Sequence, residues 1–344
     1  MKYGVDYECY ILNFFGEFNI FDDSKSKVKF LNHYNFNFSK YLPYKGKIKS
    51  RFSFLLFFIL GYFPLKKILD KNKPDYLIIH LITSLPLFIL IFFNLKTKFI
   101  LRISGYPHMN FFRKLLWKIA LKKIYLITCP TYNTLNYLKS LNIVDNSKIK
   151  LLYDPVINVR SINKKKKEKI DFKNYFLSVG RLTKQKNFMF LCKAFKKLIA
   201  ENDSIKLIIA GSGEEDFQIK KFIKQNDLSK NIILLGYIKN IYPYFANAKG
   251  FILSSLWEDP GFVLIEASHC RTPVLSSNSW PGPIELIKDD FNGVTYENDD
   301  MESFLNKFKH FKNSTDIQNI KLNGLRLSRK FSVFNHYKNL TKLI

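Results

Sequence analysis

Residues 250–269 read GFILSSLWEDPGFVLIEASH, and this stretch decides the fold class. An apolar run of strand length, 250–254, is followed by a polar loop and then by an apolar run of helix length, 261–269. A strand that is apolar throughout belongs to a sheet that helices cover on both faces. The stretch therefore predicts one strand–helix unit of a parallel sheet.

The same unit recurs through the second half of the chain. Short apolar runs predict strands at 175–180, 205–210, 231–235, 250–254 and 273–276. Periodic apolar residues predict helices at 187–201, from 214 onward, at 241–247, 261–269 and 283–287. Asn187 is expected to cap the first of these helices. This alternation predicts a doubly wound α/β domain.

The first half shows the same alternation less clearly. Candidate strands cover 10–14, 75–80, 98–103, 125–129 and 148–152, and candidate helices cover 51–69, 110–123 and 131–141. The basic run at 163–169 has no apolar period, which is typical of a solvated linker. We expect two Rossmann-like domains, 1–157 and 172–325, joined by a basic linker at 158–171. Such domains bind their ligand in the cleft between them, at the carboxyl ends of the strands.

Composition narrows the classes of protein. A chain of 344 residues, 47% apolar, is long enough for about two domains with real cores. The cysteines, at 9, 129, 192 and 270, are too far apart for a disulfide framework or a zinc site, which favours a reducing compartment. Residues 40–123 contain 17 Lys and Arg against two Asp, a net charge of +15 out of +27. That local field suggests a polyanionic partner.

No segment is predicted to span a membrane. The apolar runs 52–63 and 77–93 are shorter than the roughly 20 residues needed, and the second contains polar residues. Asp6 and Glu8 interrupt any signal-peptide core. The helix at 110–123 has an apolar face flanked by Lys and Arg, as in a helix lying on an anionic membrane surface. The alternative is an amphipathic helix packed on its own sheet.

The loop at 180–187, GRLTKQKN, follows a predicted strand and opens a helix. Arg181 and Lys186 would then lie beside free backbone N–H groups. Two cations and oriented backbone donors suit a diphosphate. The competing interpretation is an ordinary basic surface loop.

A second loop reaches the same predicted edge of the sheet. Gly261 permits close backbone approach at the start of a helix, so the N–H groups of Phe262 and Val263 can meet a phosphate. Glu258 lies before this helix and Glu266 inside it, so the two carboxylates can address hydroxyls on different parts of one extended ligand. Alternatively, both are ordinary surface charges. Glu266 lies within an apolar run, however, where a carboxylate needs a partner.

Residues 172–312 resemble the donor domain of the family 4 retaining glycosyltransferases, which have the GT-B fold and include bacterial capsule and lipopolysaccharide enzymes. The motifs match in order: GRL with KN at 180–187, IAGSG at 209–213, LGY at 235–237, the Glu258–Glu266 pair, SSN at 276–278, GPIE at 282–285 and NG at 292–293. The stretch from 331 to the end resembles the last helix of the family. We accordingly expect residues 326–344 to form a helix that returns to the N-terminal domain.

The resemblance implies roles for these residues. Arg181, Lys186 and Glu258 would be catalytic, the first two on the leaving diphosphate and Glu258 on a hydroxyl of the transferred sugar. Glu266 would bind the ribose. Gly180, Tyr237, Gly261, Phe262 and Val263 would complete the donor site, with Tyr237 near the base. The implied mechanism is front-face displacement with retention, without a metal or other cofactor.

The N-terminal part departs from the family. Members usually begin with a strand and a glycine-rich loop, whereas residues 1–15 resemble the second strand region. The sequence thus predicts that about thirty residues, one βα unit, are missing. Ser104 stands near the place of a family histidine, and His80 and His108 are the substitute candidates. An ordinary structural role is the competing interpretation for each histidine.

The resulting expectation is a cytoplasmic enzyme, peripheral to the inner membrane through residues 110–123. It would transfer a hexosyl or N-acetylhexosaminyl group from a UDP- or GDP-sugar to a glycan or lipid-linked acceptor during surface polysaccharide synthesis. The alternatives are a non-catalytic nucleotide-sugar-binding remnant and another GT-B activity, such as a nucleotide-sugar epimerase. Nucleic acid is not an expected partner, because the aromatic residues follow core periods and no recognition motif is present.

Overall fold

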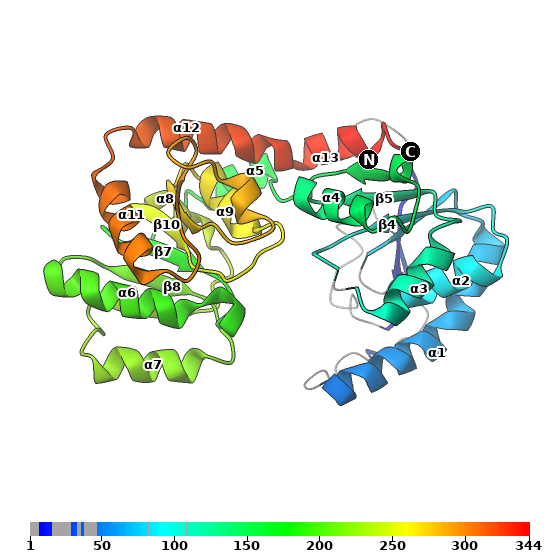
Figure 1. Ribbon diagram of the computed structural model, residues 1–344, viewed down its shortest axis with the longest axis horizontal. Helices are drawn as coiled ribbons and strands as arrows, with labels where there is room; N and C mark the ends of the chain where they lie inside the picture. The colour runs from blue at the N-terminus through cyan, green and yellow to red at the C-terminus, as the bar shows by residue number, and fades with distance from the viewer. Residues whose placement is uncertain (1–6, 16–28, 33–35, 38–46, 81–82, 108) are drawn as a thin grey trace. The chain divides into compact units, whose positions relative to one another are not determined.

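The computed structural model describes residues 7–15, 29–32, 36–37, 47–80, 83–107 and 109–344 (Figure 1). The chain divides into two compact units. Unit 1 consists of Met1–Ile103, His108–Thr128 and Leu138–Lys150, and unit 2 consists of Ser104–Pro107, Cys129–Tyr137 and Leu151–Ile344. The chain passes into unit 2 for the last time between Lys150 and Leu151. The predicted domain bounds, with a first domain ending at 157, stay a prediction.

The first part of the chain contains a parallel sheet of four strands. Its order is β3-β4-β5-β6, formed by Tyr76–Ile79, Lys98–Arg102, Leu126–Cys129 and Ile149–Leu151. Strands β1 (Tyr10–Asn13) and β2 (Lys29–Asn32) pair separately, also in parallel. The helices are α1 (Lys47–Asn72), α2 (Ser84–Phe92), α3 (Phe111–Ala120) and α4 (Tyr132–Ser140). The predicted strands are confirmed, and β2 and α2 were not predicted.

The parallel sheet of unit 2 has six strands in the order β12-β11-β10-β7-β8-β9. In chain order, β7 to β12 are Phe176–Val179, Leu207–Ala210, Ile232–Gly236, Gly250–Leu253, Val274–Ser277 and Val294–Tyr296. Alternate strand residues face two separate cores: Phe176 and Leu207 belong to one, Leu177 and Ile208 to the other. This alternation confirms the predicted doubly wound sheet.

Helices cover both faces of this sheet (Figure 1). One core contains side chains from α6 (Phe188–Glu201), α7 (Asp216–Gln225) and α11 (Met301–Asn313). The other contains side chains from α5 (Val159–Lys165), α8 (Tyr242–Asn247), α9 (Phe262–His269) and α10 (Pro283–Leu286). Because all the strands are parallel, their carboxyl ends and the loops that follow them lie along one edge.

Three local predictions are wrong. Residues 159–165 of the predicted linker form α5, because Asn158 caps this helix and Ile162 is buried in the core. Asn187 adopts left-handed backbone with φ +53°, and its side chain donates to Asp299 instead of capping α6. Residues 326–344 do not form one continuous helix. Helix α12 (Ile317–Ser328) ends within this range, a 3-10 turn covers Arg329–Phe331, and α13 covers Val333–Leu340.

Helix α1 is longer than its apolar run predicted. Residues Phe52–Asn72 are long and apolar enough to cross a membrane by length and composition, with a mean hydropathy of 1.7. About a third of that window, 33%, is buried in the structure. The sequence prediction ended the run at 63, whereas the helix continues past Pro64 through further apolar residues.

Candidate active site

Two loops at the carboxyl edge of the unit 2 sheet are joined by hydrogen bonds. They follow β7 and β10, which are neighbours in the sheet. The N–H of Leu256 donates to the Gln185 carbonyl at 2.8 Å, and Gln185 Nε2 donates to the Trp257 carbonyl at 2.8 Å. Ser254 Oγ donates to the Lys186 carbonyl at 2.9 Å. The loops carrying Lys186 and Glu258 are therefore one connected structure.

Lys186 and Glu258 form an ion pair across these loops. The side chains are only 13% and 9% exposed, and Ser255 Oγ also donates to Glu258 Oε1 at 2.8 Å. A Cβ at Gly180 would lie 3.4 Å from the Lys186 side chain, so Gly180 leaves the room that this side chain occupies. Burial of either charge alone would be costly, and pairing offsets part of that cost. The ammonium has three donors, so Lys186 can also meet a phosphate oxygen.

Arg181 is exposed on the same loop. Within the described part of the chain, no side chain pairs with its guanidinium. Behind it, the loop packs closely against the turn after β8. A Cβ at Gly211, where φ is +151°, would lie 1.8 Å from the Gly180 carbonyl oxygen, and one at Gly213 would lie 2.3 Å from that of Leu182. These glycines hold the Arg181 loop in place while its guanidinium remains available to a ligand.

Helix α9 begins at the second loop. Gly261, with φ +94°, occupies the N-cap position, a backbone conformation that favours glycine. Phe262 is exposed and Val263 is partly buried. In the first turn the N–H of Leu264 donates to the Gly261 carbonyl at 3.0 Å. The N–H groups of Phe262 and Val263 come before it and have no acceptor within the helix, so this end of α9 can receive an anion.

Glu266 lies one turn further along α9 and has a partner. Tyr242, at the start of α8, donates its hydroxyl to Glu266 Oε1 at 3.0 Å. Burial raises the pKa of Glu266, and the bond from Tyr242 opposes that rise in part. Burial and the neighbouring carboxylate likewise raise the pKa of Tyr242. The sequence indicated that Glu266 needs a partner, and Tyr242 fills that position.

The remaining predicted residues are more dispersed. Tyr237 follows β9, the edge strand two places from β7, and is 78% exposed. His80 is exposed in unit 1 with its Nδ1 3.3 Å from Arg102 Nη1, and Ser104 is exposed in unit 2. His108 lies outside the described residues. Their site roles stay predictions.

A set of polar residues near the second loop was missed as a site feature. Asp259 Oδ2 accepts from Thr134 Oγ1 at 2.9 Å, and Asp259 Oδ1 is buried without a hydrogen-bond partner in the described part of the chain. Burial raises the pKa of Asp259 to about 6, and the charges of Asp154 and Glu285 add to the rise. The Glu285 carboxylate accepts from the N–H groups of Tyr132 and Asn133, at 2.9 and 3.0 Å, at the start of α4.

The GPIE motif and the position beside Glu258 were the sequence signals for Glu285 and Asp259. Neither signal indicates a partner that is more than 100 residues away along the chain. In the described ranges, no group of three or more His, Cys, Asp or Glu side chains is arranged as metal ligands.

Known glycosyltransferases are similar to this chain in sequence. Residues 159–321 match the family described as "Glycosyl transferases group 1". An uncharacterized glycosyltransferase of Methanocaldococcus jannaschii is 31% identical over 251 residues, covering 66% of this chain and 61% of that protein. The Campylobacter jejuni N-acetylgalactosamine-N,N'-diacetylbacillosaminyl-diphospho-undecaprenol 4-alpha-N-acetylgalactosaminyltransferase is 34% identical over 167 residues, covering 48% of this chain and 45% of the relative. The matches thus span less than two thirds of these relatives.

Solved structures share the fold. A glycosyltransferase from Rickettsia africae superposes with a TM-score of 0.72 at 16% identity, covering 93% of this chain and 85% of that one. TarM gives a TM-score of 0.67 at 20% identity, covering 83% and 58%. Anabaena HepE in complex with UDP gives 0.68 at 14% identity, covering 92% and 85%. Residues 159–321 therefore match the group 1 glycosyltransferase family, and the chain has the GT-B fold of two Rossmann-like domains.

Proposed function

We propose that the protein transfers a sugar from a nucleoside-diphosphate donor to a glycan or lipid-linked acceptor, with retention of configuration. The observation that carries the proposal is the joined pair of loops after β7 and β10. These loops place the exposed Arg181 guanidinium, the Lys186–Glu258 pair and the start of α9 on one edge of the unit 2 sheet. Cations and a helix N-terminus together stabilise a leaving diphosphate.

The proposed reaction is a front-face displacement. The bond from the anomeric carbon to the diphosphate oxygen breaks, and a bond to the acceptor hydroxyl oxygen forms on the same face. The acceptor's proton passes to the departing phosphate oxygen. Arg181 and Lys186 stabilise the charge on that group without a metal, Glu258 orients a hydroxyl of the transferred sugar, and Glu266 accepts hydrogen bonds from the ribose. UDP or GDP sugars carrying a hexose or N-acetylhexosamine are the candidate donors.

The names of relatives support a lipid-linked acceptor. The C. jejuni relative acts on a diphospho-undecaprenol saccharide, and an Escherichia coli relative is a UDP-Gal:alpha-D-GlcNAc-diphosphoundecaprenol alpha-1,3-galactosyltransferase, 34% identical over 135 residues. That match covers 38% of this chain and 34% of the relative. Such an acceptor lies at a membrane, so a cytoplasmic enzyme must reach the membrane surface.

Unit 1 offers a surface suited to that location. Phe111 and Phe112 on α3 are 75% and 78% exposed, whereas Trp117 on the same helix is buried. Most of the predicted apolar face of 110–123 thus points outward, which favours the interfacial interpretation over packing on the sheet. Basic residues flank it. Such a helix binds anionic lipid through both apolar burial and charge.

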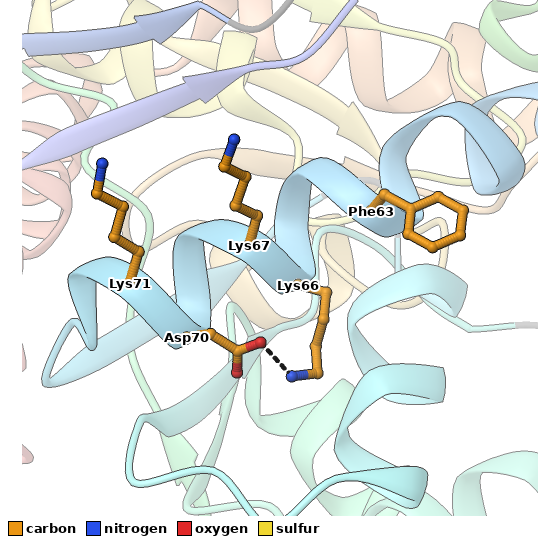
Figure 2. A pocket seen from close by; sticks show the side chains of 5 residues that line it. All are labelled: Phe63, Lys66, Lys67, Asp70 and Lys71. Carbon is orange, nitrogen blue, oxygen red and sulfur yellow. Dashed lines mark hydrogen bonds and ion pairs between the residues drawn. The ribbon is translucent and has the colours of Figure 1, made fainter.

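Helix α1 also exposes apolar side chains, and it belongs to the same packed group of helices, since α1 packs on α2 and α2 packs on α3. Five of its apolar side chains are largely exposed: Phe52, Phe54, Leu55, Ile59 and Phe63. Lys67 and Lys71 follow Phe63 along the helix, and Figure 2 shows both projecting from one side of it. Lys66 instead pairs with Asp70. We propose that the five exposed apolar side chains of α1, together with Phe111 and Phe112, form the membrane-facing surface.

Release of nucleoside diphosphate from a panel of UDP and GDP sugars tests the proposal, with and without lipid extract as acceptor source. Turnover should persist in EDTA, and proton NMR of the product should show the donor's anomeric configuration. Nucleotide binding without turnover across the panel would favour the non-catalytic remnant. Conversion of the donor to an isomeric nucleotide sugar would favour the epimerase.

A further inference from the structure

A pocket lies at the end of α9 that is remote from Gly261. It has a volume of about 350 Å³ and is lined by Val159, Asn163, Lys166, His269, Arg271, Leu325 and Arg329. Three of these residues are cations and none is an acid. Gly261 and the candidate donor loops lie at the start of α9 and His269 is its last residue, so this pocket is separate from the proposed donor site.

His269 is the buried member of this lining, at 5% exposure. Its Nδ1 lies 3.2 Å from Ser328 Oγ, and that hydroxyl donates to the Leu325 carbonyl at 2.7 Å. Because the only hydroxyl proton of Ser328 is used there, Ser328 accepts from His269, and the ring proton lies on Nδ1. Nε2 of the neutral ring is then a hydrogen-bond acceptor, and it is buried without a partner among the residues that the structure describes.

The surroundings keep this ring neutral. Burial, followed by the charges of Lys166 and Arg329, lowers the pKa of His269 to about 4. Among its neighbours, Cys270 is a neutral thiol with its pKa raised to about 12, and Arg271 is a further cation. Glu266 lies one turn earlier on α9 and bonds to Tyr242. The neutral His269 ring therefore shares the lining of this pocket with three cations.

An ordinary anion satisfies only part of this arrangement. Its oxygens can accept hydrogen bonds from Lys166, Arg271 and Arg329. The lone pair on His269 Nε2 would repel them, because both groups are acceptors. A phosphate that keeps one proton offers both groups, since it has anionic oxygens and one acidic O–H donor. We propose that this pocket binds a singly protonated phosphate group, with its P–O–H donating to His269 Nε2 and its other oxygens facing the three cations.

Comparison of inorganic phosphate with sulfate tests the proposal on the full chain by isothermal titration. At pH 8 and matched ionic strength both ions are mainly dianions of similar size, but only hydrogen phosphate carries a proton. Phosphate should bind about tenfold more tightly, the scale of one hydrogen bond gained against an acceptor left unsatisfied. The preference should shrink as the pH falls, because a protonated His269 can donate to sulfate.

Three variants assign the effect. His269→Phe should bind both ions equally, with no pH dependence, and Ser328→Ala, which frees the ring proton to move to Nε2, should reduce the preference without altering the lining. Arg329→Gln should weaken both ions severalfold, whereas the control Lys330→Gln, beside the pocket but outside its lining, should not. Melting curves establish that each variant folds.

Glycerol phosphate and vesicles containing phosphatidate, both tested at about pH 6 where a phosphate monoester still keeps a proton, then distinguish a soluble ligand from a lipid headgroup, and loss of either interaction in Arg329→Gln supports the pocket. Equal affinity for phosphate and sulfate at pH 8, a preference that survives in His269→Phe, or binding of neither ion would overturn the proposal. None of these results depends on donor turnover, so this proposal and the proposed function fail separately.

Discussion

The ammonium of Lys186 and the carboxylate of Glu258 form a largely buried ion pair that joins the loop after β7 to the loop after β10. The pair gives Lys186 two tasks, because the same ammonium that neutralises Glu258 is a candidate ligand of the donor diphosphate. Substitutions at either position will therefore change stability as well as activity, and the two effects have to be measured separately.

Lys186→Met should destabilise the fold by about 3–5 kcal/mol, since it leaves the Glu258 carboxylate buried without its cation. Lys186→Met combined with Glu258→Gln should recover much of that loss, because no charge then remains buried. Urea unfolding of the two variants and the parent measures the difference. A single variant as stable as the parent would show that the pair is not buried in solution. Lys184→Met, on the same loop but exposed, is the matched control.

Nucleotide affinity should decrease as the pH is lowered, because Glu266 becomes protonated. Its pKa is raised by burial, so this carboxylate loses its charge at a higher pH than an exposed glutamate would. Ribose hydroxyls donate better to the ionised form, and affinity should therefore decrease as the pH falls through the raised pKa. Titration of UDP or GDP across pH 4–8 measures this.

Tyr242→Phe should move that transition to still higher pH, because the Tyr242 hydroxyl bond favours the charged form of Glu266. Glu266→Gln should abolish the transition. Tyr244→Phe, on the same helix, is the control. An unshifted transition in Tyr242→Phe would remove Glu266 as its source.

Asp259 should make the fold less stable as the pH rises from about 4 to 6. Its pKa is raised from 3.8 to about 6, so the native state holds a proton that the unfolded chain has already released in that window. Asp259 stabilises the fold below its pKa in the unfolded chain. This contribution, at most about 3 kcal/mol, is lost as the pH rises through its pKa in the folded protein.

Asp259→Asn should therefore be more stable than the parent above pH 6, and the gain should diminish as the pH falls to 4. Melting temperatures of both proteins over pH 4–8 give the comparison, with the exposed Asp203→Asn as control. A stability difference that does not change with pH would mean that Asp259 titrates normally.

Phe111→Ser combined with Phe112→Ser should reduce binding to anionic vesicles at least tenfold, because burying one phenyl ring is worth about 1.5–3 kcal/mol. Cosedimentation with vesicles measures the bound fraction, and rising salt should release the parent protein because exposed charges are screened. Phe217→Ser, which removes an equally exposed ring from α7, should bind as the parent does. Equal binding of the parent to neutral vesicles would contradict a charge-assisted membrane surface.

The doubly wound sheet of unit 2 could be predicted because most of its strand residues are buried and apolar, as throughout Leu207–Ala210. The sequence also located the loops at 180–187 and 254–261, since each lies between a clear strand and a clear helix. Less could be predicted where local and tertiary preferences differ. Helix α2 lies within the apolar run 77–93, for which no helix was predicted, and its Pro86 stands in the first turn, where proline is tolerated.

Contacts between distant residues account for the other misses. Lys186 and Glu258 were each selected as site residues, but nothing in the sequence indicates that they pair, because 72 residues separate them. Asn187 was expected to cap α6 by residue type, whereas its left-handed backbone turns the side chain toward Asp299. The outward apolar face of α3 could not be distinguished by periodicity from an inward one.

The kinetic effect of Arg181→Ala tests the central claim most directly. The guanidinium is exposed and has no partner within the described residues, so the variant should fold with the stability of the parent. Arg181 is proposed to act on charge that grows as the diphosphate leaves, so turnover should fall about 10²–10³-fold while the affinity for the nucleotide-sugar donor falls much less. Arg160→Ala, on α5, is the matched control. Unchanged turnover in a folded Arg181→Ala protein, or affinity and turnover lost in equal proportion, would contradict the account.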